Sequence, residues 1–239
     1  MSIPYWICVF NVLKFGVRVV SQPLESYKAL VPSEKAYWNA TVVSSLHAVW
    51  LVVNTWVSIR DTPSLLTSTS IGHTTPQLSE TLNMFLGYLL YDLVGVVRFF
   101  GRWRGSKLML IHHLTAIFMW SLMVYYQKGH SLALYAQLCE FTTPFINNRW
   151  FLKQFHRDGG NIGLSNRLII FISWIVFRLG LFGYGGTQIL YKLYHSYEDT
   201  PVLLGVSLVG NFVVGYSLQW TWFMKMVNIV KNMVRKSVL

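Results

Sequence analysis

Charged residues are scarce in this chain, and acidic ones most of all. Of its 239 residues only 12% are charged, against 53% hydrophobic, and the mean hydropathy is +0.41. Soluble domains carry about a quarter charged residues, so the composition excludes an ordinary soluble domain. Twenty Lys and Arg face nine Asp and Glu, which gives a net charge of +11. Too little polar sequence surrounds these cations to build a nucleic-acid-binding face, so we expect a membrane protein with basic loops and no nucleic-acid partner.

Cysteine is almost absent, and histidine clusters are missing. Cys8 and Cys139 both lie in apolar surroundings, so no disulfide framework holds the fold together. Three histidines fall inside apolar segments, too few for a membrane di-iron oxygenase, and no HExxH spacing occurs. We therefore expect no metal, with a single zinc ion left as the alternative.

Long apolar segments dominate the sequence. A helix needs about 20 mostly apolar residues to cross a bilayer. Seven segments meet or approach this length: residues 3–20, 38–58, 81–97, 107–126, 131–148, 167–189 and 202–224. They leave only short connectors, so no separate soluble domain is expected. Because Lys14 and Arg18 follow the first apolar run, we interpret that segment as a retained anchor rather than a cleavable signal peptide.

Lys and Arg are distributed unevenly between alternate loops. Fifteen of the twenty fall on one side: Arg18, Lys28, Lys35, Arg98, Arg102, Arg104, Lys107, Arg149, Lys153, Arg157, Arg167, Lys225, Lys231, Arg235 and Lys236. The other side holds Arg60, Lys128 and Lys192. The positive-inside rule then predicts a luminal N-terminus and a cytosolic C-terminus. The sequon at Asn39 lies at the cytosolic end of the second span and should stay unmodified.

Six ionisable side chains fall well inside the predicted spans: His47, Asp92, His112, His113, Glu140 and Arg178. Such a group near the bilayer centre costs several kcal/mol and requires a partner or a function. At about 1.5 Å per helical residue, all six lie roughly 8–17 Å below the cytosolic face. We interpret them as one polar site, built by five helices, that opens towards the cytosol.

A structural role is the alternative for each of these residues. For Arg178 we favour a pair with Glu140 or Asp92 that holds the bundle in register. For His47 a hydrogen bond between helices and a functional role are equally open. His112 and His113 differ, because consecutive helical residues point about 100° apart. One can face the site while the other contacts a neighbouring helix, and we favour function for this pair.

Proline and glycine mark two further features. Pro144 follows Glu140 by one turn and removes the hydrogen bond to its carbonyl, so we expect a kink and a free carbonyl beside the carboxylate. Four glycines within residues 180–186 should let helices approach closely rather than bind phosphate. Trp222 is interpreted as an anchor at the membrane interface.

Four motifs in order resemble the TLC-domain family, the multi-pass membrane proteins that include the ceramide synthases. They are WNATVVSSLH (38–47), GYLLYDL (87–93), IHH (111–113) and EFTTPFINNRW (140–150). The last is most similar to the smaller TLC domain-containing proteins. The resemblance implies an all-α membrane protein of about seven transmembrane helices. Six of them would form a helical barrel around a polar cavity in a TLC domain at 35–230, between an N-terminal anchor helix and loop at 1–34 and a basic cytosolic tail at 231–239.

The resemblance also implies a role in lipid metabolism or homeostasis at the endoplasmic reticulum. In ceramide synthases the histidines that match His112 and His113, with an aspartate pair on the following helix, transfer a fatty-acyl group from acyl-CoA. That aspartate pair is absent here, and Glu140 is the only carboxylate in the corresponding helix. The histidines remain.

Two functions follow from these residues. The first is a fatty-acyltransferase in which His112, His113, Asp92 and Glu140 are catalytic, His47 and Arg178 support them, and acyl-CoA is the co-substrate. The second is a non-enzymatic protein that binds membrane lipids and regulates membrane composition. A transporter ranks behind both, because no inverted repeat is visible. No cofactor is expected, and a homodimer is left open.

Overall fold

A computed structural model of the chain describes residues 1–103 and 105–238, with side chains described up to residue 228. Arg104 of the basic loop, and the side chains of Lys231, Arg235 and Lys236 in the predicted tail, lie outside the described residues. The elements are α1 (Ile3–Ser21), α2 (Glu25–Lys28), α3 (Pro32–Asp61), α4 (Ser64–Thr67), α5 (Pro76–Arg98), α6 (Ser106–Tyr126), α7 (His130–Leu138), η1 (Cys139–Thr142), α8 (Thr143–Gln154), α9 (Asn161–Ser173), η2 (Trp174–Leu181), α10 (Phe182–His195) and α11 (Val202–Val238). All elements in this part of the chain are helical, as the sequence predicts.

Six helical stretches are long and apolar enough to cross a membrane: α1, α3, α5, α6, α9 to α10, and α11. The remaining predicted segment, residues 131–148, is the fifth in chain order. It is built from α7, η1 and α8, which follow one another without a break from His130 to Gln154. A 3₁₀ turn divides it into short pieces, which is why none of them reaches the length of a span by itself.

Contacts between loops show that this divided segment runs from one end of the bundle to the other. At one end, the Trp103 indole N–H donates to the carbonyl of Ser33 at 3.1 Å, and the rings of Tyr37 and Trp150 lie 5.2 Å apart. At the other end, the amide of Gly129 donates to the carbonyl of Ile71 at 2.8 Å. We call these the basic end, which carries most Lys and Arg, and the opposite end. Successive loops alternate between them, as seven crossings require.

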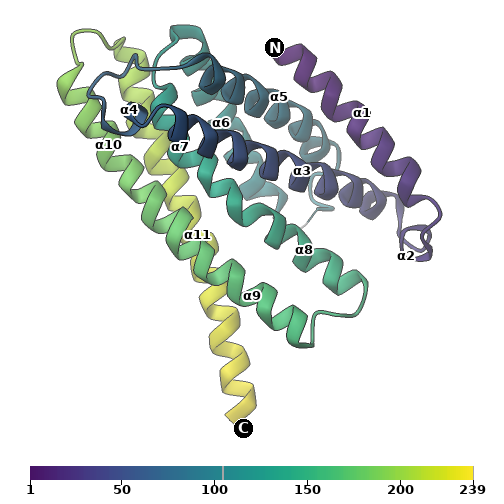
Figure 1. Cartoon of the computed structure of the whole chain (residues 1–239). Helices are drawn as coiled ribbons and strands as arrows, with labels where there is room; N and C mark the ends of the chain where they lie inside the picture. Colours follow the sequence, from purple (N-terminus) through teal and green to yellow (C-terminus); the bar gives the residue numbers. More distant parts are fainter. Residues whose placement is uncertain (104, 239) are drawn as a thin grey trace.

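The last six of these segments close into a ring. In order around it, α3 contacts α5, α5 contacts α6, α6 contacts α11, α11 contacts α10, α10 contacts α7, and α7 and α8 contact α3. Helix α1 lies outside this ring along α3 and α5, at the edge of the bundle in Figure 1. A Cβ atom at Gly87 of α5 would lie 2.7 Å from the Cβ of Trp6, so the missing side chain allows α1 to pack tightly on α5.

Two neighbouring segments depart from α-helical geometry at the same level. η1 is a 3₁₀ turn that ends at Thr142, two residues before Pro144, and η2, which it contacts, is a π-helix. The helix is irregular at this point, where Pro144 cannot donate the next helical hydrogen bond, while the kink itself stays a prediction. The carbonyl of Glu140, however, is not free as expected. It accepts the backbone N–H of Thr143, since the tighter 3₁₀ turn supplies a nearer donor.

The glycines of residues 180–186 allow close helix packing, as the sequence predicts. A Cβ atom at Gly186 would lie 2.2 Å from the ring of Phe212 on α11, and one at Gly185 would lie 2.8 Å from the Cβ of Tyr135 on α7. These small residues let two aromatic side chains pack directly against the backbone of α10.

Candidate functional site

Asp92 and His113 form a direct pair between α5 and α6. The His113 Nε2 atom lies 2.9 Å from Asp92 Oδ2, and the side chains are 4% and 14% exposed. The other ring nitrogen, Nδ1, lies 2.9 Å from the carbonyl oxygen of Met109. A carbonyl only accepts, so Nδ1 must donate to it, and a further proton must lie between Nε2 and the carboxylate. Neither nitrogen of His113 therefore keeps a lone pair for other chemistry.

His112 is in the reverse situation. Its ring stands nearly perpendicular to that of His113, with centroids 5.6 Å apart, and its edge contact with Trp222 of α11 spans 5.8 Å. It is partly exposed, and neither ring nitrogen makes a hydrogen bond within the described residues. The 100° step between consecutive helical positions produces this difference, because it turns one imidazole to α5 and the other to α11.

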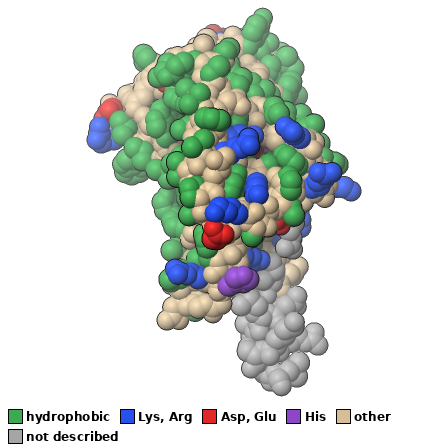
Figure 2. Space-filling view, turned by 90° about the vertical axis from the view of Figure 1, so that its right-hand side faces the viewer, with side chains coloured by type: hydrophobic (Ala, Val, Ile, Leu, Met, Phe, Trp, Pro, Cys, Tyr) green, Lys and Arg blue, Asp and Glu red, His purple; other side chains and the backbone are tan. Residues whose placement is uncertain are grey.

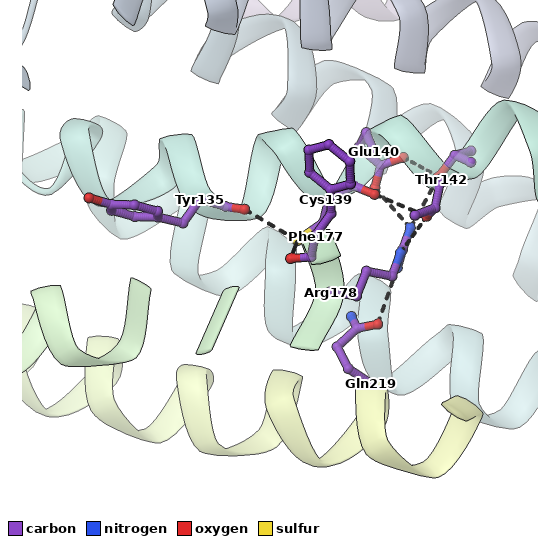
Figure 3. Close-up of polar contacts among 8 residues, drawn as sticks. Tyr135, Cys139, Glu140, Thr142, Phe177, Arg178 and Gln219 are labelled. Atoms are coloured by element: carbon purple, nitrogen blue, oxygen red, sulfur yellow. Dashed lines mark hydrogen bonds and ion pairs between the residues drawn. The ribbon is translucent and has the colours of Figure 1, made fainter. Parts of the chain in front are cut away.

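Glu140 and Arg178 form the second group, at the two irregular segments. The Arg178 guanidinium donates to Thr142 Oγ1 at 2.6 Å, to Thr143 Oγ1 at 3.2 Å and to Gln219 Oε1 at 3.3 Å. Thr143 in turn donates to Glu140 Oε2 at 2.6 Å. Figure 3 shows these groups converging from η1, η2 and α11.

The ion pair between Arg178 and Glu140 is loose. The nearest nitrogen and oxygen atoms lie 3.9 Å apart, beyond hydrogen-bonding distance. The guanidinium also packs over the ring of Trp174 at 4.7 Å. Arg178 is 7% exposed, so its charge is compensated mainly by hydroxyl and amide oxygens and by an aromatic face. Through these contacts Arg178 links η1, η2 and α11. This agrees with the structural role favoured from the sequence, in which Arg178 holds the bundle in register.

The two groups belong to one polar layer. Trp222 bridges them, since its ring contacts His112 and also lies 6.2 Å from Trp174. Trp222 therefore packs within the site, in addition to any role at the membrane interface.

His47 occupies an aromatic pocket apart from the ion pairs. Its ring stacks on Tyr88 with centroids 3.7 Å apart, and Phe10 and Phe85 contact it at 5.8 and 5.2 Å. It is 2% exposed, and neither ring nitrogen has a hydrogen-bond partner among the described residues. The hydrogen bond between helices that the sequence left open is thus not formed here. Tyr88 lies one helical turn before Asp92, which places His47 beside the layer rather than in it.

Three polar residues of the layer were missed by the sequence analysis: Thr142, Thr143 and Gln219. Their side chains are uncharged and common in membrane helices, so nothing in the pattern distinguishes them. The two threonines do lie between Glu140 and Pro144, in the stretch that the sequence marks as unusual. Gln219 carries no such signal, because it follows 41 residues after Arg178 and only the fold brings them together.

Two further observations delimit the site. Within the described residues no three His, Cys, Asp or Glu side chains converge as a metal site would require. A groove of about 360 Å³ lies between α8 and α9, lined by Phe145, Asn148, Asn161, Ile162, Ser165, Asn166 and Ile169. It contains none of the six ionisable residues that the sequence predicts as the site.

Comparison with known proteins adds the family. Residues 37–228 match the family model of the TLC domain. The chain is 24% identical to TLC domain-containing protein 4-B of Xenopus laevis over 76% of its length and 72% of that protein. It is 23% identical to human TLC domain-containing protein 4, over 83% of the chain and 76% of that protein. It is also 21% identical to Topoisomerase I damage affected protein 4 of Saccharomyces cerevisiae, over 85% of the chain and 73% of the relative. Because the match extends over most of the chain, this protein belongs to the TLC-domain family of membrane proteins.

Proposed function

We propose that this protein is a fatty-acyltransferase of membrane lipid metabolism, with His112 as the residue that receives the acyl group. One observation carries the proposal: of the two adjacent imidazoles, only His112 keeps free ring nitrogens and partial exposure. A nucleophile or general base needs an available lone pair, which His113 lacks. The resemblance to ceramide synthases supports acyl-CoA as the donor.

The atoms and protons of the proposed acyl transfer balance with His112 as the only protein residue that forms and breaks bonds. A nitrogen of His112 adds to the thioester carbonyl, the carbon–sulfur bond breaks, and the imidazole proton passes to the departing thiolate. A hydroxyl or amine of a lipid then attacks the acyl-imidazole, and its proton returns to the ring. The ester or amide forms as the carbon–nitrogen bond to His112 breaks.

The remaining residues act by positioning and charge. The Asp92 contact fixes the ring of His113 and with it the rotation of α6, which aims His112 at α11. Arg178 places a positive charge near His112, where a carbonyl oxygen would become negative during attack. Glu140 is held by Thr143 and balances that charge.

Non-enzymatic lipid binding is the second candidate, and one observation favours it. Most polar groups of the layer already satisfy one another, as in the network around Arg178 and the pair of Asp92 and His113. Such a layer could serve only to hold the bundle together around a lipid-binding site. The protein would then adjust membrane composition without turnover.

For location, we infer an endoplasmic-reticulum membrane with a luminal N-terminus and a cytosolic C-terminus. The family resemblance supports the organelle, and the excess of Lys and Arg at the basic end supports the orientation. Asn39 is 5% exposed and donates to the Tyr27 hydroxyl at 3.0 Å, so the folded protein does not present this sequon at its surface.

Denaturing mass spectrometry after incubation with long-chain acyl-CoA tests the proposed function. We expect a fatty-acyl mass increment on the purified protein, lost in His112→Ala and retained in His195→Ala. His195 is an exposed histidine at the opposite end and controls for non-specific acylation. An increment that survives His112→Ala would overturn the assignment of His112. No increment, with a lipid still bound in native mass spectra, would favour the binding function.

A further inference from the structure

Three cations lie on α1 and α5 in the half of these helices nearer the basic end. Lys14 of α1 places its ammonium 5.5 Å from the ring centre of Tyr91 on α5. Arg98 follows Tyr91 by seven residues, two helical turns later on the same face of α5. Arg18 follows Lys14 by four residues, one turn later on the same face of α1. We call Lys14, Arg18 and Arg98 the α1–α5 basic cluster.

No carboxylate neutralises this cluster. None of the three cations forms an ion pair within the described residues. The acid within electrostatic range of Lys14 is Asp92, whose Oδ2 atom already contacts His113, and Arg98 acts on Lys14 with the opposite sign. Among the described residues, the positive charge of Lys14 is therefore only partly balanced.

Helix dipoles account for two of the cations but not for the third. Arg18 and Arg98 lie in the last turns of α1 and α5, where the free carbonyls favour positive charge. Lys14 lies seven residues before the end of α1, about 10 Å deeper. A half-buried ammonium inside a spanning helix is costly without a counter-ion.

The surroundings identify the chemistry of a counter-ion. Phe15 and Val19 of α1, and Val94 and Val97 of α5, are exposed apolar side chains that lie close in sequence to the three cations. The buried hydroxyl of Tyr91 has no hydrogen-bond partner among the described residues. Figure 2 shows the face of the bundle that includes α1, where Lys and Arg gather among hydrophobic side chains with few acidic ones.

We propose that the α1–α5 basic cluster binds the phosphate of an anionic membrane phospholipid. Lys14 and the two arginines supply charge-assisted hydrogen bonds to the phosphate oxygens, and the apolar flanks contact the acyl chains. This site lies outside the six-segment ring and is independent of acyl transfer at His112. It also gives α1, which precedes the residues matched to the TLC domain, a function of its own.

Native mass spectrometry of the full chain, with added phosphatidylglycerol, tests this site. Wild type should retain the lipid, and a thermal unfolding scan should show a higher midpoint in its presence. The variants Lys14→Met and Arg98→Gln should each reduce the bound fraction by about tenfold and abolish the thermal shift. Lys14→Arg should restore both. Lys28→Gln is the matched control, since Lys28 is a basic-end cation already paired with Glu25 at 2.6 Å.

Two further probes identify the source of the phosphate. Diacylglycerol with the same acyl chains should neither bind nor stabilise the protein, because it lacks the phosphate. Glycerol 1-phosphate should give no thermal shift, because it lacks the chains. Equal retention of phosphatidylglycerol by wild type and Lys14→Met would overturn the proposal, as would equal stabilisation by the soluble phosphate. Lys14→Met removes an unpaired charge and is expected to fold.

Discussion

At the scale of single residues, two side chains of the same type can differ in chemistry because their surroundings differ. His112 and His113 are adjacent in sequence, yet among the described residues His112 has no hydrogen-bond partner for its ring nitrogens, whereas both nitrogens of His113 have one. The carboxylate of Asp92 determines this difference, since it holds one ring and leaves the other free. Which of the two adjacent histidines is the better candidate therefore depends on hydrogen bonds between helices.

The Asp92 and His113 pair should contribute strongly to stability. Asp92→Ala leaves His113 Nε2 buried without a partner, and we expect the free energy of unfolding to fall by about 3 kcal/mol. Replacing both residues with Leu should recover much of this loss, because no buried polar group is then unpaired. Unfolding in detergent with increasing denaturant measures both effects.

Asp61→Ala is the control for this pair. Asp61 is exposed and bound to exposed Arg60, so its removal should change stability by less than about 1 kcal/mol. If Asp92→Ala were as stable as Asp61→Ala, the contact between Asp92 and His113 would not stabilise the packing of α5 on α6, contrary to what its geometry indicates.

At the scale of elements, irregular helix geometry places the second half of the site. Pro144 produces the 3₁₀ turn of η1, which carries Glu140, and the facing π-helix η2 carries Arg178. A regular helix would turn these side chains to other directions, because both the 3₁₀ and the π geometry change the rotation per residue. Such departures from α-helical geometry are frequent at functional sites.

The glycines of α10 give a stability prediction at this scale. Gly186→Ala places a methyl group within 2.2 Å of Phe212, so we expect a loss of about 1–3 kcal/mol as α10 and α11 are forced apart. Gly210→Ala is the matched control on α11, where an added Cβ meets nothing within 4 Å. Thermal unfolding of the two variants in the same detergent compares them. A similar midpoint for both would show that α10 and α11 do not pack this closely.

At the scale of the whole molecule, seven crossings put successive loops at alternate ends. The loop before α5 meets the α6–α7 connection at the opposite end, while Trp103 and Trp150 lie near Tyr37 at the basic end. If the segment from α7 to α8 did not cross, the chain would have six crossings, and the connections before α7 and after α8 would lie at the same end. The contacts place them at different ends.

Cysteine labelling tests both the crossings and the orientation. The chain has only Cys8 and Cys139, which can be replaced by Ala and Ser to give a cysteine-free background. We expect Gly159→Cys, at the basic end, to react with a membrane-impermeant maleimide in sealed microsomes. Thr67→Cys, at the opposite end, should react only after permeabilisation. An added side chain at Gly159 meets no atom within 4 Å, so this substitution should not disturb the fold.

Other labelling results would contradict either the orientation or the number of crossings. Labelling of Thr67→Cys alone in sealed vesicles would invert the orientation inferred from Lys and Arg. Labelling of both positions, or of neither, would contradict the seven crossings themselves.

The sequence by itself determined the class of the protein and the positions of its long apolar helices. Apolar length and charge bias act locally along the chain, so they can be read without the fold. The position of Pro144 likewise marks where the helix becomes irregular, because a missing N–H acts within one turn. The resemblance carried by the four motifs predicted the family that the match to the TLC domain shows.

Only the tertiary structure decided which polar groups meet. It paired Asp92 with His113, left His112 free, surrounded His47 with aromatic rings and brought Gln219 to Arg178. It also placed Lys14 of α1 beside Tyr91 of α5. These outcomes depend on the rotation of each helix about its axis and on contacts between residues far apart in the chain. No local pattern encodes them, since depth in the membrane fixes a residue's level but not its partner.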